Sequence, residues 1–428
     1  AQSGKQWIVS MNAISEKSQL PSLRSFDVSS VRSDFPILSR SVHDKPLVYL
    51  DSAASAQKPQ PVIQAIKHQY EYEYANVHRG AYWLSETLTD KYEAARKAVR
   101  DFINARSDRE IIFTKGATEA INLVAHSFGK DLGPNDEIVI TELEHHSNIV
   151  PWQMLRTQTG VKLKVVPVTP EGDVTLEAIK AAVTTNTKLV AVAHVSNVLG
   201  TILPIKEIAE VAHTTGARIL IDGCQGIVHE TVDVQDLDCD FYAFSGHKLY
   251  GPNGIGVLFG KESLLHDMPP YQGGGEMISS VSFDHTEWAD LPAKFEAGTP
   301  PIVPAVGLGA AIEYISSFDR AEVARHEHDL MVYAMECLEV INGVRLVGTS
   351  KNKAAVIAFV VDGAHPHDVA TILDRSGVCV RAGHHCAQPL MDSMGYPATL
   401  RASIGMYNTR EEINALVGAL EKAREILC

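Results

Sequence analysis

Six short β-rich runs, several of them separated by helical patterns, constrain the fold of this chain more than any other feature of its sequence. The runs cover residues 137–141, 162–166, 188–193, 218–221, 241–244 and 255–259, and helical patterns at 149–158, 176–183 and 205–213 separate the first four. Strands that alternate with helices in this way form a mostly parallel sheet that helices cover on both faces. The sequence therefore predicts an α/β protein whose ligands bind at the carboxyl ends of the strands.

Polar side chains gather where these predicted strands end. The clusters are residues 144–148, 194–197, 222–225 and 245–248. Polar residues scattered at random would not all follow strands, whereas the carboxyl ends of parallel strands meet at one edge of a sheet. The four clusters therefore predict a single site.

Lys248 stands at the end of one of these strands, in the stretch FYAFSGHKLYGP. A lysine in such a place is either a solvated loop residue or an amine beside cations, partly desolvated, whose pKa falls so that it acts as nucleophile or base. Asp222 ends the preceding predicted strand and Gln225 follows it. A strand-end carboxylate followed one strand later by a strand-end lysine is the arrangement that holds pyridoxal phosphate (PLP), because the lysine bonds to the cofactor and the acid pairs with its pyridinium nitrogen.

Three further segments allow two interpretations each. Gly116, Ala117 and Thr118 open a predicted helix, where free N–H groups favour a phosphate, although Thr118 is equally a capping residue. The small residues at 51–55 could let the backbone approach a ligand or could cap a helix. His145 follows a strand, where a histidine is commonly structural but could stack on a cofactor ring.

Composition excludes several classes of partner. The chain has 428 residues and a formal net charge of -14, which argues against nonspecific binding to nucleic acid or to anionic membranes. No apolar run reaches the roughly 18 residues of a membrane span. The six cysteines form no CxxC pair and no disulfide framework, which favours a reducing compartment. We expect a cytoplasmic protein, with the plastid stroma as the alternative.

Prolines at 300, 301 and 304 mark a change of composition near which a domain boundary is predicted. We expect a polar, flexible N-terminal extension at residues 1–30, a large domain at 31–304 and a smaller α+β domain at 305–428. The small domain contains the segment RAGHHCAQP, whose polar surroundings could expose and stabilise a thiolate of Cys386. A zinc site of His384, His385 and Cys386 with His365 or His367 is the weaker alternative, because adjacent histidines rarely bind one ion together.

The chain resembles the group II cysteine desulfurases of the SufS type, which overlap with the selenocysteine lyases. The resemblance extends from about residue 31 to residue 427 and rests on DFPIL, YLDSAASAQKP, NVHRG, ATEAINLVA, EHHSNIVPWQ, HVSNVLGT, FSGHKLYGP, FEAGTP and RxGHHCAQP, in this order. It implies the PLP-dependent transferase type I fold, with a mostly parallel seven-stranded sheet in the large domain, and a homodimer.

The resemblance also implies roles for individual residues. Lys248 would be the Schiff-base lysine, Cys386 the nucleophile that forms a persulfide, and His145 the residue that stacks on the ring. The remaining cofactor ligands would be Asp222 at the pyridinium nitrogen, Gln225 at the ring hydroxyl, Thr118, Ser245 and His247 at the phosphate, and Thr299 lent by the opposite subunit. The substrate carboxylate would meet Arg401, with Arg381, Asn197 and His78 nearby. Ala117 departs from relatives that have threonine there, so one phosphate contact is in doubt.

The implied activity converts L-cysteine to L-alanine and leaves the sulfur on the enzyme as a persulfide, for iron–sulfur cluster assembly. Selenocysteine would be a second substrate, and a SufE-like or SufU-like protein would accept the sulfur, since the loop before Cys386 is short. A hairpin is expected within residues 277–292. No metal is expected. The alternatives are another type I PLP enzyme, such as an aminotransferase or a kynureninase-like enzyme, and a zinc-binding protein without PLP.

Overall fold

The computed structural model describes residues 23–428, so most of the predicted extension at 1–30 lies outside the described residues. The first helix, α1 (Val28–Ser33), begins within that predicted extension. Asp27 caps it, because its carboxylate accepts a hydrogen bond from the Ser30 N–H at 2.9 Å.

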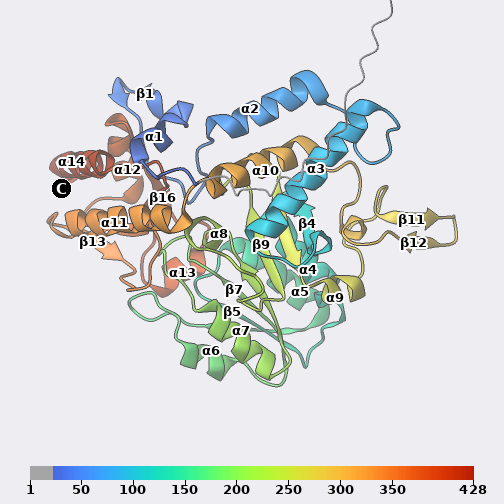
Figure 1. Cartoon of the computed structure of the whole chain (residues 1–428). Helices are drawn as coiled ribbons and strands as arrows, with labels where there is room; N and C mark the ends of the chain where they lie inside the picture. Colours follow the sequence, from blue (N-terminus) through green and yellow to red (C-terminus); the bar gives the residue numbers. More distant parts are fainter. Residues whose placement is uncertain (1–22) are drawn as a thin grey trace, which may run out of the picture.

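A seven-stranded sheet forms the centre of the molecule (Figure 1). Its strand order is β4-β10-β9-β8-β7-β5-β6. The strands are β4 (Ile111–Thr114), β5 (Glu137–Thr141), β6 (Lys162–Val166), β7 (Thr187–Ala193), β8 (Arg218–Asp222), β9 (Phe241–Ser245) and β10 (Gly256–Gly260). In this sheet β10 alone runs opposite to the other six strands, pairing antiparallel with both β4 and β9. The predicted mostly parallel sheet is confirmed.

Successive side chains of the central strands enter two different cores, as the period of two in a strand requires. In β7, Leu189 and Ala191 pack in the core beneath α4 (Ala117–Ser127) and α5 (Val150–Thr159). Val190 and Val192 pack on the opposite face. The helices of that face include α3 (Trp83–Phe102), α6 (Leu176–Ala182), α7 (Ile205–Thr214) and α10 (Ile302–Ser316). Both faces are therefore covered, which explains why the central strands β7, β8 and β9 are almost continuous apolar runs.

A smaller antiparallel sheet has the order β13-β14-β17-β16. Its strands are β13 (Val344–Val347), β14 (Val356–Val361), β16 (Arg381–Gly383) and β17 (Thr399–Ser403), and α11 (Arg320–Glu339), α12 (Pro366–Arg375) and α14 (Arg410–Leu427) share its core. The β-rich run at 378–381, which the sequence favours as a single strand, is divided, because β15 (Val378–Cys379) pairs with β3 (Val48–Tyr49) whereas β16 pairs with β17. The residues of β3, although early in the chain, therefore pair with a strand of the small unit.

The predicted domain limits stay predictions, but the packing of α10 bears on them. This helix begins at Ile302 and lies against α3 and α2 (Gln60–His68), so it belongs with the large unit. Burial of its side chains continues to Ile315 in the core of the large sheet. This contact favours a boundary after α10.

The hairpin expected within residues 277–292 is confirmed, and it projects from the body of the molecule (Figure 1). It consists of β11 (Ile278–Val281) and β12 (Thr286–Trp288), and Phe283 at its tip is fully exposed. The remaining strands and α-helices are β1 (Ser41–Val42), β2 (Lys45–Pro46), α8 (Gly226–His229), α9 (Glu262–Asp267) and α13 (Gln388–Ser393). Within residues 23–428, none of the helices combines the length and the apolar character needed to cross a bilayer.

Candidate active site

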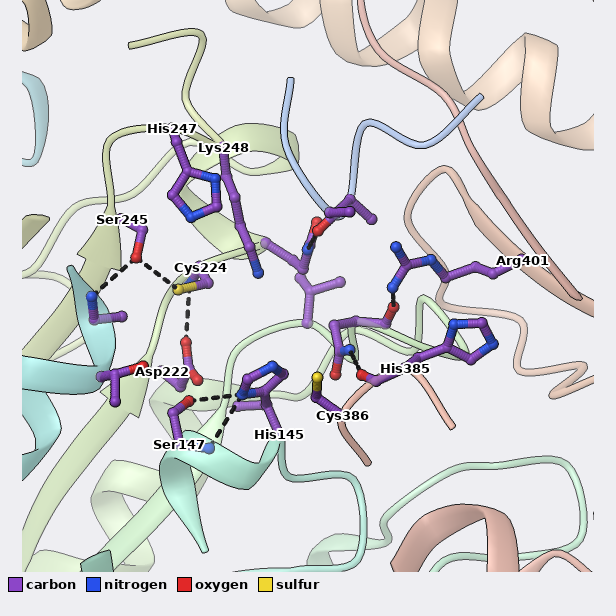
Figure 2. A pocket seen from close by; sticks show the side chains of 18 of the residues that line it. His145, Ser147, Asp222, Cys224, Ser245, His247, Lys248, His385, Cys386 and Arg401 are labelled. Atoms are coloured by element: carbon purple, nitrogen blue, oxygen red, sulfur yellow. Dashed lines mark hydrogen bonds between the residues drawn. The ribbon is translucent and has the colours of Figure 1, made fainter. Parts of the chain in front are cut away.

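A cavity of about 240 Å³ lies at the carboxyl ends of β5, β7, β8 and β9, beside the small sheet (Figure 2). It brings together residues that lie far apart in the chain. Most of the residues predicted for the site line this cavity. They are Thr118, His145, Asn197, Asp222, Gln225, Ser245, His247, Lys248, Arg381, Cys386 and Arg401. The polar clusters that follow the predicted strands therefore share one cavity.

The N-terminus of α4 forms one wall of this cavity. The Ala117 N–H donates to Ser245 Oγ at 2.9 Å, and Thr118 follows on the cavity surface. The β10 backbone lies so close behind this turn that a Cβ on Gly256 would stand 2.4 Å from Gly116 Cα. Glycine at that position therefore brings the helix terminus next to Ser245, where N–H groups and hydroxyls can hold a phosphate.

Asp222 and Gln225 lie at the end of β8. The Asp222 side chain is buried, and its Oδ1 accepts a hydrogen bond from the Cys224 N–H at 3.1 Å. The Gln225 Nε2 donates to the Ala53 carbonyl at 2.8 Å, which joins this strand end to the run of small residues after β3. Burial raises the pKa of the Cys224 thiol to about 12, so this cysteine is a neutral lining group.

His145 follows β5 and faces the cavity. Its Nδ1 accepts a hydrogen bond from the Ser147 N–H at 3.1 Å and lies 2.8 Å from Ser147 Oγ. Burial, aided by the positive charge of Lys248, lowers the pKa of His145 to about 4. The ring is therefore neutral at pH 7, and because Nδ1 is an acceptor its proton resides on Nε2.

Lys248 follows β9 and extends into the cavity (Figure 2). The backbone before it is fixed, because the His247 carbonyl accepts hydrogen bonds from Lys58 Nζ at 2.9 Å and from the Ala56 N–H at 3.1 Å. Burial lowers the pKa of Lys58 to about 8, and burial with the charge of Lys248 lowers the pKa of His247 to about 4. His247 is thus neutral at pH 7.

Cys386 lies on a left-handed turn that the large unit anchors. Both His385 and Cys386 have positive φ values, 54° and 57°, an uncommon conformation for residues other than glycine. The Cys386 carbonyl accepts from the His146 N–H at 2.7 Å, and the His385 carbonyl accepts from Asn197 Nδ2 at 2.7 Å. These bonds to two strand-end loops tether the cysteine to the cavity that Lys248 enters.

Arg381 and Arg401 come from neighbouring strands of the small sheet. Arg401 is buried, and its Nη1 donates to the Asn197 carbonyl at 2.8 Å. The carboxylate of Asp51 contacts both guanidinium groups, at 2.9 Å from Arg381 Nη2 and 3.0 Å from Arg401 Nη2. Two cations of the cavity lining therefore share one carboxylate.

Two residues predicted for the site do not line this cavity. The His78 ring lies 3.1 Å from Glu93, and its hydrogen bond to Glu93 raises the pKa of His78. Thr299 lines a separate cavity with Phe113 and Tyr271. The resemblance implies that Thr299 acts in the opposite subunit, and its role stays a prediction.

Four contributors had no individual role predicted from the sequence. These are Asp51, Lys58, Ser147 and His385, although Ser147 lies in the polar cluster 144–148, Asp51 in the run 51–55, and His385 in the weaker zinc alternative. The small residues after β3 gave a signal, because Ala53 and Ala54 do line the cavity, but nothing in the sequence indicated the contact of Asp51 with two arginines. Within residues 23–428 no cluster of three or more His, Cys, Asp or Glu side chains could hold a metal ion.

The donor set of the cavity fits PLP. Lys248 supplies an amine, Asp222 a buried carboxylate that can pair with a pyridinium nitrogen, and His145 a neutral ring at the cavity wall. Ser245 and the N-terminus of α4 supply hydroxyl and N–H donors of the kind that bind a phosphate. These groups occupy different walls, so that one elongated cofactor could contact them all.

Comparisons with known proteins agree with this chemistry. The aminotransferase class-V family model matches residues 48–416. The probable cysteine desulfurase of Vibrio cholerae is 50% identical over 402 residues, which cover 94% of this chain and 99% of the relative. The probable cysteine desulfurase of Halalkalibacterium halodurans is 52% identical over 392 residues, covering 91% of this chain and 96% of the relative.

Solved structures give the same result. The crystal structure of the cysteine desulfurase CsdA from Escherichia coli matches with a TM-score of 0.88 and 40% identity, covering 94% of this chain and all (100%) of that chain. The apo cysteine desulfurase of Thermococcus onnurineus matches with a TM-score of 0.88 and 41% identity over 93% of this chain and 98% of that chain. From its sequence and its structure, the chain belongs to the aminotransferase class-V family, and within that family to the cysteine desulfurases.

Proposed function

We propose that this protein is a PLP-dependent cysteine desulfurase that releases L-alanine from L-cysteine and keeps the sulfur on Cys386 as a persulfide. The observation that carries the proposal is the shared cavity of Lys248 and Cys386, with Asp222 on its buried wall. A transaminase needs a lysine such as Lys248 and a carboxylate such as Asp222, but its reaction does not require a thiol such as that of Cys386. Homologues named as cysteine desulfurases, at about half identical residues, support the same activity.

When bound, PLP supplies an electron-withdrawing ring that stabilises negative charge on the α-carbon of an amino acid. Asp222, as a buried carboxylate, would hold the ring nitrogen in its protonated form. His145 would lie against the ring as a neutral imidazole, with its orientation fixed by Ser147. Lys248 would hold the cofactor and, once its amine is free, would move the proton from the α-carbon of the substrate.

Arg401 would receive the carboxylate of the substrate, because it is buried and held by Asn197 at the cavity wall. Asn197 also holds the loop of Cys386, so one residue positions both the substrate carboxylate and the sulfur acceptor. This arrangement would direct the substrate sulfur toward Cys386.

The thiolate of Cys386 would then attack the sulfur of the substrate. A new S–S bond forms, the substrate Cβ–S bond breaks, and its electron pair stays with the substrate, where a proton completes alanine. No external oxidant is required, because the substrate carbon is reduced as the sulfur is oxidised to the persulfide level.

Replacement of Cys386 by alanine tests the proposal. Sulfide and alanine produced from L-cysteine, in the presence of a reducing thiol, should fall to background in Cys386→Ala, while PLP binding should remain. The matched control is Cys428→Ala, which removes another exposed thiol far along the chain. Unchanged turnover in Cys386→Ala would favour an aminotransferase or a kynureninase-like enzyme. Selenocysteine should still be cleaved to some extent by that variant, because selenium is the better leaving group.

The proposal extends to partners and location. A SufE-like or SufU-like acceptor would remove the sulfur, because the tethered Cys386 turn keeps the persulfide in the cavity and the acceptor must reach it there. Iron–sulfur scaffold proteins would receive the sulfur indirectly. A homodimer would allow Thr299 of one subunit to meet the phosphate site of the other. The free state of all six cysteines supports a reducing, cytoplasmic setting.

A further inference from the structure

Two arginines lie opposite each other on adjacent strands of the small sheet. Arg381 of β16 and Arg401 of β17 are direct partners in the antiparallel register. Like charges that stand opposite one another on a sheet are destabilising. The Arg401 guanidinium is buried with 2% of its side chain exposed, so water screens its charge poorly. This pair therefore needs a counter-charge.

Asp51 supplies that counter-charge. Its carboxylate accepts from Arg381 Nε at 3.2 Å and from Arg381 Nη2 at 2.9 Å, which is a two-pronged contact, and from Arg401 Nη2 at 3.0 Å. Asp51 follows β3 and forms a parallel bridge with Ser403 of β17, so its backbone is fixed to the same sheet. The formal charges of the three side chains sum to one positive charge.

The contact with Asp51 leaves the two arginines with different free donors. The Nε and Nη2 edge of Arg381 is occupied by Asp51. Arg401 still has an unpaired N–H donor, because among the described residues its buried Nε has no hydrogen-bond partner. A buried donor without a partner is costly. This free donor favours the entry of one carboxylate.

Building on the proposed function, we propose that Asp51 is a specificity-determining residue that makes this cavity accept an amino acid with one carboxylate and reject one with two. A second carboxylate, on the substrate side chain, would point toward Cys386 and Arg381, which line the same cavity. It would find the Nε and Nη2 edge of Arg381 already paired, and the negative charge of Asp51, directly behind the two lining arginines, would repel it. Rejection through an occupied partner and a like charge is a common route to specificity.

The test measures binding of L-aspartate and L-alanine to the PLP-loaded enzyme by titration calorimetry. L-Alanine is the single-carboxylate probe and L-aspartate the two-carboxylate probe. In Asp51→Asn the affinity for L-aspartate relative to L-alanine should rise at least about tenfold, because Arg381 is released and the repelling charge is gone. Asp51→Glu, which keeps the charge, should leave the ratio near the wild-type value.

Asp362→Asn is the matched control, because Asp362 pairs with Arg345 in the small unit at 2.9 Å, away from the cavity. An Asp51→Asn variant in which both affinities fall together would assign Asp51 a purely structural role and overturn the proposal. Should Asp51→Asn fail to fold, the double variant Asp51→Asn/Arg381→Gln restores the net charge and takes away the released Arg381, so the proposal requires from it a rise in the ratio well below tenfold. A tenfold rise in that double variant would overturn it equally.

Calorimetry uses no turnover, so the two hypotheses fail separately. An enzyme that makes no alanine from L-cysteine would disprove the proposed function, yet the two affinities would still be measurable. KM and kcat for L-cysteine give a further readout, since loss of positioning alone lowers kcat and leaves the binding ratio unchanged.

Discussion

Glu296 is the residue outside the cavity whose removal we expect to cost most. Its carboxylate accepts two hydrogen bonds from Arg96, at 2.7 and 3.0 Å, one from the Phe113 N–H at 2.7 Å and one from the Tyr92 hydroxyl at 3.1 Å. Arg96 is buried with 2% of its side chain exposed, and it also donates to the Ile111 carbonyl at 2.8 Å. The pair thus joins the FEAGTP segment to α3 and β4.

Arg96 also pairs with Glu93 at 2.9 Å, so replacing Glu296 by alanine removes one of its two carboxylate partners and leaves the Phe113 N–H and the Tyr92 hydroxyl without their acceptor. Removal of one member of a buried, hydrogen-bonded ion pair costs about 3–5 kcal/mol. At about 2.1 cal/mol/K per residue, unfolding of 428 residues has an entropy of about 0.9 kcal/mol/K. The midpoint of thermal unfolding should therefore fall by about 3–6 °C, as measured by circular dichroism or calorimetry on the PLP-loaded protein.

The double variant Arg96→Met/Glu296→Leu separates the charge from the packing. Apolar groups of similar volume often replace a buried ion pair at little cost, so the double variant should recover the part of the lost stability that comes from the unpaired guanidinium, while the Phe113 N–H and the Tyr92 hydroxyl still lack their acceptor. An exposed pair, Lys206 and Asp236, gives the control, because Asp236→Asn should shift the midpoint by less than about 1 °C. A Glu296→Ala midpoint within 1 °C of the wild type would refute the reasoning.

Three other predictions concern the cavity and its partner. Lys248→Ala should abolish the visible absorbance band of the PLP-loaded protein in its usual position, whereas Lys261→Ala should keep it; a colourless wild type with bound zinc would instead favour the metal alternative. Because burial lowers the pKa of His145 from 6.5 to about 4, the unfolded chain binds more protons between these values. Stability from this group is complete above about pH 6.5, and is lost as the pH falls toward 4. His145→Gln should therefore flatten the fall of the unfolding midpoint over that window; an unaltered slope would contradict the assignment. A SufE-like or SufU-like acceptor should raise alanine production several-fold, and altering the hairpin at 277–292 should weaken this activation more than PLP binding; a flat response to acceptor concentration would mean that persulfide transfer is not limiting.

The large sheet was predictable because the sequence pattern that specifies each strand is local. Each central strand is an apolar run, and alternate residues of β7 enter different cores, so the pattern required no knowledge of distant residues. The strand-end clusters followed for the same reason, since parallel strands place their carboxyl ends together. Lys248 and Asp222 could thus be assigned to one site from the chain order of two strands.

Other features depend on contacts between distant segments, which the chain order does not encode. Asp51 meets Arg381 and Arg401 only because β3 pairs with β15 and Asp51 bridges to β17. From sequence alone it was equally a helix cap. The short strand predicted at 378–381 divides for a similar reason, since its two halves have different neighbours. Only the family resemblance placed Arg401 in the site.

The turn that presents Cys386 gives the last prediction. His385 Nε2 lies 2.8 Å from Thr399 Oγ1, and this is the contact that holds the His385 ring, whose buried Nδ1 has no partner among the described residues. Thr399→Val removes the hydroxyl while keeping the shape, and a buried polar group left without a partner costs about 1–3 kcal/mol. Because His385 and Cys386 are both in the left-handed conformation, which is disfavoured without such support, the turn should open more often.

Exchange of the His146 amide hydrogen, which bonds to the Cys386 carbonyl, measures that opening, with the Gly160 amide at the end of α5 as the internal reference. In Thr399→Val the exchange rate at His146 relative to Gly160 should rise about fivefold or more, since 1 kcal/mol changes an opening equilibrium by about that factor. Alanine production from L-cysteine should fall while the visible PLP band is retained. Thr371→Val, which removes a hydroxyl from the exposed face of α12, should change neither rate. An unchanged ratio in Thr399→Val would show that the bonds from His146 and Asn197 hold the turn without the ring of His385.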